Sequence, residues 1–202
     1  MYYRSGKPVI FQNHPPTEML EIVQQHKRDN LTIAEIGVAE GHTSKLVIDV
    51  VVEMKGHMYA VDWFQGNLEV EDPEHPHGHN TNQEVIDFKY NHYYNLMRSK
   101  FSSTEEMNKH LTILKGKSFD VADFIQDESL DICFLDAGHG YEDVSRDIKR
   151  YLPKIKPGGI ICGHDYDFMH DDVVKAVDEM FHDRVIVVHA GRTPCRSWKV
   201  ML

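Results

Sequence analysis

Apolar residues gather in short runs that are separated by glycine, proline and charged residues. The runs are residues 31–36, 58–62, 111–114, 132–135, 160–162, 185–189 and 197–202. Short apolar runs between turn signals are typical of buried strands. The last two runs are joined by a turn that is too short for a parallel crossover, so they predict a closing antiparallel hairpin.

Between most of these runs, apolar residues recur at the three- and four-residue spacing of a helix. This spacing predicts helices from residue 17, around residues 43–54, over 85–101, around 121–125, over 141–151 and over 173–181. The fold that we predict is α/β: a Rossmann-like, mostly parallel sheet of seven strands with a C-terminal antiparallel hairpin and helices on both faces.

The chain has 202 residues, 41% of them hydrophobic and 27% charged, which suits a single domain over residues 1–202. Its net charge of −10 argues against a general affinity for nucleic acid or anionic membranes, because both require a basic surface. No apolar stretch is long enough for a signal peptide or a membrane span, so we expect a cytoplasmic protein.

The regular pattern is lost after residue 62 and returns in the aromatic-rich helix predicted over 85–101. We interpret residues 63–103 as an insertion, or lid, over the mouth of the expected active site. Within this insertion, Pro76 and Gly78 separate His75, His77 and His79, so a solvated lid is favoured over a metal site formed by these histidines. The aromatic helix could also form a homodimer contact.

A glycine-containing turn follows the first predicted strand. Residues 35–41 read Glu-Ile-Gly-Val-Ala-Glu-Gly, and Asp62 ends the next strand about twenty residues later. That offset suits an acid that binds a ribose, but a dinucleotide fingerprint would need a third glycine to approach a pyrophosphate. The turn therefore favours a nucleoside ligand without a pyrophosphate.

Acids and histidines follow two other predicted strands. Asp136 and His139 come after residues 132–135, and His164 and Asp165 come after residues 160–162. In open α/β sheets, ligands bind in the crevice outside the carboxyl ends of the strands. We therefore expect a metal-binding or catalytic group at this edge.

Together these motifs resemble the class I S-adenosylmethionine-dependent methyltransferases, and the resemblance covers nearly the whole chain from Leu31 onward. Within that superfamily, the chain is most similar to the metal-dependent O-methyltransferases of the catechol and macrocin type. One subfamily combines Asp-x-x-His-x-Tyr with Gly-His-Asp-Tyr, and this chain has the first motif at residues 136–141 and the second at residues 163–166.

The resemblance implies a role for each matching residue. The cofactor-binding residues would be Glu35, Gly37, Ala39, Gly41, Thr43, Asp62, Trp63, Ser118, Phe119 and Asp136. The metal ligands would be Asp136, His164 and Asp165, and the catalytic base would be His139. Catechol-type enzymes carry Asp-Asn where this chain has His-Asp. If His164 is a ligand, the choice of metal widens to Mn²⁺, Fe²⁺ or Zn²⁺, whereas oxygen ligands alone favour Mg²⁺.

The function that the resemblance implies is methyl transfer from S-adenosylmethionine to a hydroxyl group of a small molecule or sugar, with Mg²⁺ or Mn²⁺ as the expected cation. We expect neither nucleic acid nor a membrane as a partner. Two alternatives stay open: an NAD(P)-linked oxidoreductase on a Rossmann-like sheet, and a non-catalytic nucleoside-binding module.

Overall fold

The computed structural model describes residues 17–64, 94–95, 97–99, 109–188 and 196–202. It also describes the backbone of two short strands, β1 (Tyr3–Arg4) and β2 (Lys7–Pro8), which pair antiparallel. Most of the predicted insertion at 63–103, including His75, His77 and His79, lies outside the described residues, so the insertion stays a prediction.

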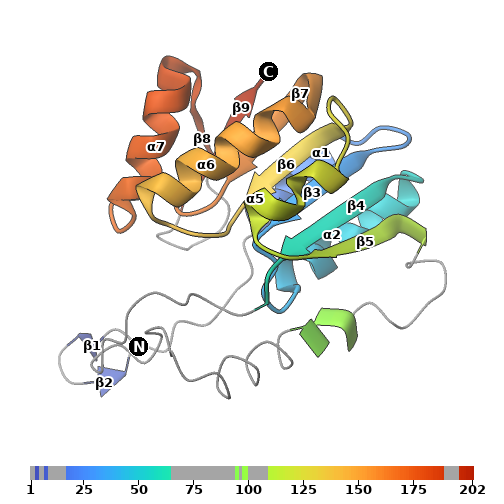
Figure 1. The fold of residues 1–202 in the computed structure, drawn as a ribbon, viewed down its shortest axis with the longest axis horizontal. Helices are drawn as coiled ribbons and strands as arrows, with labels where there is room; N and C mark the ends of the chain where they lie inside the picture. The colour runs from blue at the N-terminus through green and yellow to red at the C-terminus, as the bar shows by residue number, and fades with distance from the viewer. Residues whose placement is uncertain are drawn as a thin grey trace.

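Seven strands form one sheet in the order β5-β4-β3-β6-β7-β9-β8 (Figure 1). They are β3 (Thr32–Ile36), β4 (His57–Asp62), β5 (Leu111–Lys115), β6 (Leu130–Leu135), β7 (Ile155–Gly163), β8 (Ile186–Val188) and β9 (Ser197–Met201). The pairs from β5 to β7 are parallel, and β9 runs antiparallel to both β7 and β8. The prediction of a mostly parallel sheet that closes with an antiparallel hairpin is confirmed.

Helices cover both faces of this sheet, as predicted (Figure 1). They are α1 (Thr17–Gln25), α2 (His42–Glu53), α5 (Ser118–Val121), α6 (Tyr141–Tyr151) and α7 (Asp171–Phe181), with the short 3₁₀ segments η1 (Ala122–Phe124), η2 (Leu152–Lys154) and η3 (His182–Arg184). Successive side chains of a strand point to opposite faces. On β6, Ile132 and Phe134 join the apolar cluster of α1 and α2, whereas Cys133 and Leu135 join the cluster of α5, α6 and α7.

The segment after β5 is not one continuous helix. Val121 and Ile125 are buried, but Phe124 between them is 73% exposed. The chain changes from α5 to the tighter η1 at Ala122, and a 3₁₀ turn places its side chains differently from an α-helical turn.

None of the helices that the structure describes combines the length and the apolar character needed to span a bilayer.

The strand order places the reversal point of the sheet between β3 and β6. From β3 the chain continues to β4 and β5 on one side, and from β6 it continues to β7 on the other. Ligands bind at such a reversal, outside the carboxyl ends of the strands. The turns after β3 and β6 meet there, because the Asp136 amide donates a hydrogen bond to the Ile36 carbonyl oxygen at 2.7 Å.

Asp131 on β6 is a buried carboxylate with three hydrogen-bond donors around it. Its side chain is 3% exposed and accepts hydrogen bonds from the Arg28 guanidinium, from Lys156 Nζ at 2.7 Å and from the Thr32 amide at 2.7 Å. Burial alone would raise the pKa of Asp131, but the two cations and the amide hold it below its usual value.

We expect Asp131→Asn to lower the free energy of unfolding at pH 7 by about 2 kcal/mol, since two partly exposed cations lose their counter-charge. The Asp131 pKa is lower in the folded chain than in the unfolded one, where it is about 3.9. The charge-dependent part of this stabilisation is therefore present above about pH 4 and is lost as the pH falls through the folded-state pKa. Urea unfolding of the wild-type protein and of Asp131→Asn between pH 7 and pH 3 checks this. A difference in the free energy of unfolding that stays constant over that range would contradict the prediction.

Candidate active site

The turn after β3 is built on two left-handed glycines. Gly37 has φ +92° and Gly41 has φ +73°. Gly41 is the N-cap residue of α2, which has no side-chain capping hydrogen bond. Thr43, a predicted cofactor residue, lies in the first turn of this helix and is 5% exposed. These three predicted residues therefore lie around one turn at the reversal point of the sheet.

Asp62, at the end of β4, reaches across to this turn. Its Oδ2 accepts hydrogen bonds from the amides of Val38 at 2.8 Å and Ala39 at 2.7 Å, and its Oδ1 accepts one from the Phe64 amide at 2.5 Å. The amides of Val38 and Ala39 therefore point to the same carboxylate oxygen, and Ala39 itself has a left-handed φ of +46°. Burial raises the pKa of Asp62 although these hydrogen bonds oppose the shift. The acid predicted to bind a ribose thus also shapes the glycine turn.

Glu35 precedes the glycine turn and is 1% exposed. Its carboxyl group accepts a hydrogen bond from the Ser44 hydroxyl in the first turn of α2. Burial raises the pKa of Glu35 well above its usual value. The contact joins the end of β3 to the beginning of α2, which fixes both ends of the turn that carries Gly37 and Gly41.

The predicted nucleoside-binding residues Trp63 and Phe119 flank one ammonium group. Lys117 Nζ lies 5.6 Å from the centroid of the Trp63 ring and 5.8 Å from that of the Phe119 ring. Ser118 does not cap α5, whose N-cap residue is Lys117 without a side-chain capping bond. The structure therefore brings Trp63, Ser118 and Phe119 to the same side of the sheet reversal, although they come from different turns.

The predicted metal ligands converge at the ends of β6 and β7. His164 Nδ1 lies 3.0 Å from Asp165 Oδ1 and 3.8 Å from Asp136 Oδ1. The three residues each offer a ligand atom, and these atoms lie within 4.8 Å of one another. His139 Nε2 lies 2.8 Å from Asp165 Oδ2. The predicted ligands and the predicted base thus form one cluster.

Charges in this cluster are strongly coupled. Burial raises the pKa of Asp136 to about 6. For His164, burial lowers the pKa, but the hydrogen bond to Asp165 and the nearby Asp136 charge outweigh it and raise the pKa to about 9. The hydrogen bond to Asp165 likewise raises the pKa of His139. Asp165 is buried, yet His139 and His164 hold its pKa below the usual range. Because imidazole binds a metal only when it is deprotonated, cation binding here would release protons.

Sequence reasoning missed His170. Its Nδ1 lies 3.7 Å from Asp165 Oδ1 and 3.0 Å from Asp167 Oδ1, and its ring centroid lies 5.1 Å from that of His139. His139, Asp165 and His170 form a second group that could hold a metal ion. The chain reverses at Asp165, which has φ +57°, and this turn brings the following residues back to the cluster. The density of acids and histidines over residues 163–172 is the signal that could have revealed it.

One pocket joins the strand-end residues. Its lining includes Asp136, His139, His164 and Asp165, together with Asp147 and Trp198. Among the described residues, the predicted cofactor residues of the glycine turn and of the loop after β5 do not belong to this lining. The site therefore has two parts that meet at Asp136.

The strand order, the glycine turn after β3 and the acid at the end of β4 define a class I methyltransferase architecture. Residues 34–166 match the family described as Methyltransferase domain, and the chain belongs to this family. S-adenosylmethionine is accordingly its methyl donor. The family match favours this function over the NAD(P)-linked oxidoreductase considered above. None of the curated proteins compared with the chain matches it.

Solved structures share the fold. The O-methyltransferase NovP is 19% identical with a TM-score of 0.65, over 91% of this chain and 79% of NovP. An rRNA methylase from Streptococcus thermophilus is 11% identical with a TM-score of 0.57, over 94% of this chain and 98% of that protein. The Streptococcus mutans protein SMU.1697c, in complex with SAH, is 14% identical with a TM-score of 0.59, over 93% of this chain and 98% of that protein. At these identities the likeness shows the fold alone.

Proposed function

We propose that this chain is a divalent-metal-dependent O-methyltransferase that acts on a hydroxyl group of a small molecule or sugar. The observation that carries the proposal is the convergence of Asp136, His164 and Asp165 beside His139 at the ends of β6 and β7. Such a group of ligand atoms next to the cofactor turn suits an acceptor oxygen that must be held and deprotonated.

The donor set fits a divalent cation. Asp136 and Asp165 would supply carboxylate oxygens, which Mg²⁺ and Mn²⁺ both accept, and His164 would supply an imidazole nitrogen, which favours Mn²⁺ over Mg²⁺. A bound divalent cation would supply Lewis acidity, which lowers the pKa of an acceptor hydroxyl. A second imidazole ligand from His170, which also lies near Asp165, would extend the choice to Fe²⁺ or Zn²⁺.

His139 would accept the proton of the acceptor hydroxyl. Its Nε2 faces Asp165 Oδ2 at 2.8 Å, so the N–H group of the neutral ring lies on Nε2 and the lone pair lies on Nδ1. The carboxylate also raises the pKa of His139, which makes the ring a better proton acceptor. Holding the oxygen, the methyl carbon and the sulfur in line is the larger task of the protein, since positioning can contribute roughly 7–11 kcal/mol.

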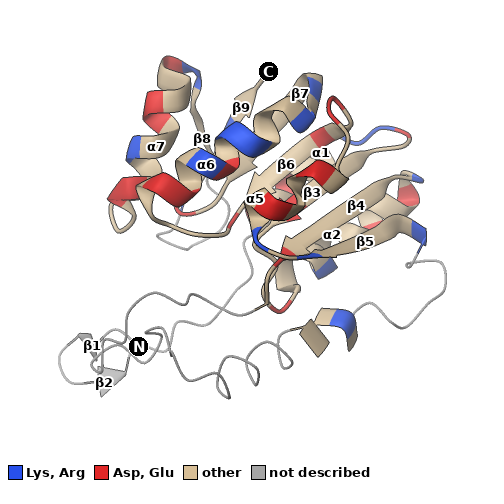
Figure 2. Ribbon diagram, in the orientation of Figure 1, with Lys and Arg blue, Asp and Glu red and all other residues tan. Residues whose placement is uncertain are grey.

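The charge around the site supports a small acceptor that is not polyanionic. The first turns of α6 and α7 adjoin the cluster and carry Glu142 and Asp143, and Asp171 and Asp172 (Figure 2). With a net charge of −10, the protein would repel a phosphate backbone. We therefore propose a small hydroxylated molecule as the acceptor, rather than an RNA of the kind that the compared rRNA methylase is named for.

The experiment is methyl transfer from S-adenosylmethionine to a panel of phenols, catechols and sugars. We expect activity to fall below detection after treatment with a chelator and to return with Mg²⁺ or Mn²⁺. Asp136→Ala should remain inactive under all of these conditions, because it removes a proposed ligand that also borders the cofactor turn. Undiminished turnover in the chelator would refute the role of the metal, and methylation at nitrogen or of RNA would refute the acceptor class.

A further inference from the structure

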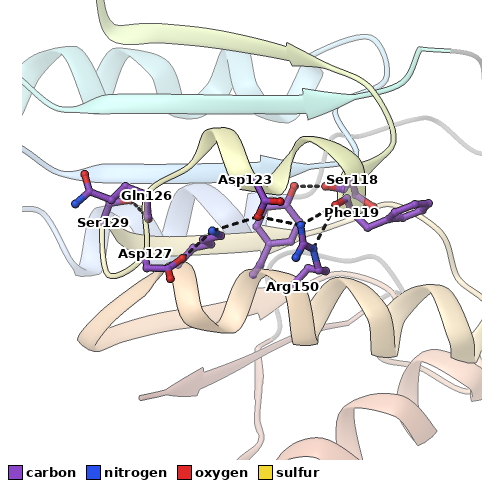
Figure 3. Close-up of polar contacts among 9 residues, drawn as sticks. Ser118, Phe119, Asp123, Gln126, Asp127, Ser129 and Arg150 are labelled. Carbon is purple, nitrogen blue, oxygen red and sulfur yellow. Dashed lines mark hydrogen bonds and ion pairs between the residues drawn. The ribbon is translucent and has the colours of Figure 1, made fainter.

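Helix α6 holds the loop that carries Ser118 and Phe119, two of the predicted cofactor-binding residues. Tyr151 Oη donates a hydrogen bond to the Ser118 carbonyl oxygen at 2.8 Å. Arg150 donates two to the Phe119 carbonyl oxygen, at 3.2 and 3.1 Å (Figure 3). The Arg146 guanidinium carbon lies 4.1 Å from the centroid of the Phe119 ring. Three side chains of one helix therefore fix the backbone and the ring at residues 118 and 119.

A fourth side chain of α6 determines the state of the Ser118 hydroxyl. Asp147 is 4% exposed, and its Oδ1 accepts the hydrogen bond that Ser118 Oγ donates at 2.5 Å. A hydroxyl group has one hydrogen and two lone pairs, whereas a carboxylate only accepts. While Asp147 holds the hydrogen of Ser118, Oγ can offer a ligand its lone pairs only.

The Asp147 carboxylate is ionised under ordinary assay conditions. Burial raises its pKa to about 6, against the hydrogen bond from Ser118 and the Arg146 charge. At pH 7.5 the carboxylate form therefore predominates, and the direction of the hydrogen bond is fixed. Asp147 also lines the pocket that contains Asp136 and His139, so it lies between the cofactor loop and the strand-end cluster.

We propose that Asp147 is a positioning residue that makes the cofactor site selective for a 6-aminopurine over a 6-oxopurine, because it leaves Ser118 Oγ as a hydrogen-bond acceptor only. The proposal rests on the proposed function and on the placement of adenine beside Ser118, which the resemblance implies for the serine of the Gly-x-Ser motif at residues 116–118. The exocyclic amino group of adenine donates hydrogen bonds, so it can pair with Oγ. The 6-oxo group of hypoxanthine is an acceptor, and two facing acceptors leave both groups unsatisfied.

Calorimetric titration with S-adenosylhomocysteine and with its 6-oxo analogue, S-inosylhomocysteine, tests this. We expect the wild-type protein at pH 7.5 to prefer the adenine compound by about 10- to 100-fold, as a site with a directed polar contact does. In Asp147→Asn, the side-chain amide can donate to Ser118 Oγ and release the hydroxyl hydrogen, so the preference should narrow at least about tenfold. Asp147→Leu should narrow it as well, since Ser118 then has no acceptor on α6.

Asp123→Asn is the matched control. Asp123 is an exposed acid of η1 that pairs with Arg150 at 3.0 Å and has no contact with the Ser118 hydroxyl (Figure 3). Its variant should keep the wild-type preference. If Asp147 had only a structural role, its loss would lower the affinity for both ligands equally. An unchanged ratio of the two affinities in Asp147→Asn and Asp147→Leu therefore overturns the proposal. Failure of the wild-type protein to bind S-adenosylhomocysteine would overturn the underlying placement of the cofactor as well.

Discussion

Asp165→Asn should reduce methyl transfer by more than about 100-fold, because even the partners that orient metal ligands are worth 10–100-fold. Asp165 belongs to both groups that could hold a metal ion, and its two oxygens face His139 and His164. Asparagine keeps the size of the side chain and tolerates the left-handed backbone of this position, which has φ +57°. The loss can therefore be assigned to the missing charge and the missing acceptor oxygen.

Affinity for Mn²⁺, measured by electron paramagnetic resonance, separates a metal ligand from a residue that acts only during catalysis. We expect Asp165→Asn to weaken Mn²⁺ binding to the same extent as turnover. Asp171→Asn is the control, because it removes the same charge from the exposed first turn of α7 without entering the cluster. Wild-type Mn²⁺ affinity in Asp165→Asn would refute the proposed ligand set.

The fold could be predicted because the local pattern of apolar residues indicates where the buried strands lie. On β6 every residue from Leu130 to Leu135 is buried, so the sequence shows a continuous run rather than an alternation. The closing hairpin followed from the length of the turn alone. Phe124 shows the limit of such reasoning, because its exposure depends on the change from α5 to η1, and periodicity alone does not reveal the change.

The sequence predicted the site residues that lie at the ends of strands. It did not predict the contacts that depend on the backbone conformation of the turns. Asp136 comes directly after β6, and His164 and Asp165 are the first two residues after β7, so the parallel pairing of these strands brings them together. His170 joins them only through the left-handed turn at Asp165. Likewise, the two amides that Val38 and Ala39 donate to Asp62 depend on the backbone conformation of the glycine turn, and the Glu35–Ser44 contact links two elements across that turn. No local sequence pattern encodes these contacts.

Gly37→Ala should lower the free energy of unfolding by about 4 kcal/mol or more, the size expected when a rigid clash is forced into a core. A β-carbon at Gly37 would lie 2.0 Å from the Asp136 carbonyl oxygen and 2.7 Å from Ala137 Cα, which are backbone atoms that no rotamer change can move. The position also has φ +92°, which an alanine rarely adopts.

Gly158→Ala separates these two causes. Gly158 has φ +78° but no atom within 4 Å of an added β-carbon, so its variant should lose only the conformational part, about 1 kcal/mol. Urea unfolding gives the loss in the free energy of unfolding for each variant. The excess loss in Gly37→Ala measures the cost of the clash where the turns after β3 and β6 meet. Since relief of the clash would displace Asp136, Gly37→Ala should also weaken both Mn²⁺ and S-adenosylhomocysteine binding, whereas Gly158→Ala should not. Equal losses of stability in the two variants would mean that the turn after β3 can move away from Asp136, and that the two parts of the site are less tightly joined than their backbone contact indicates.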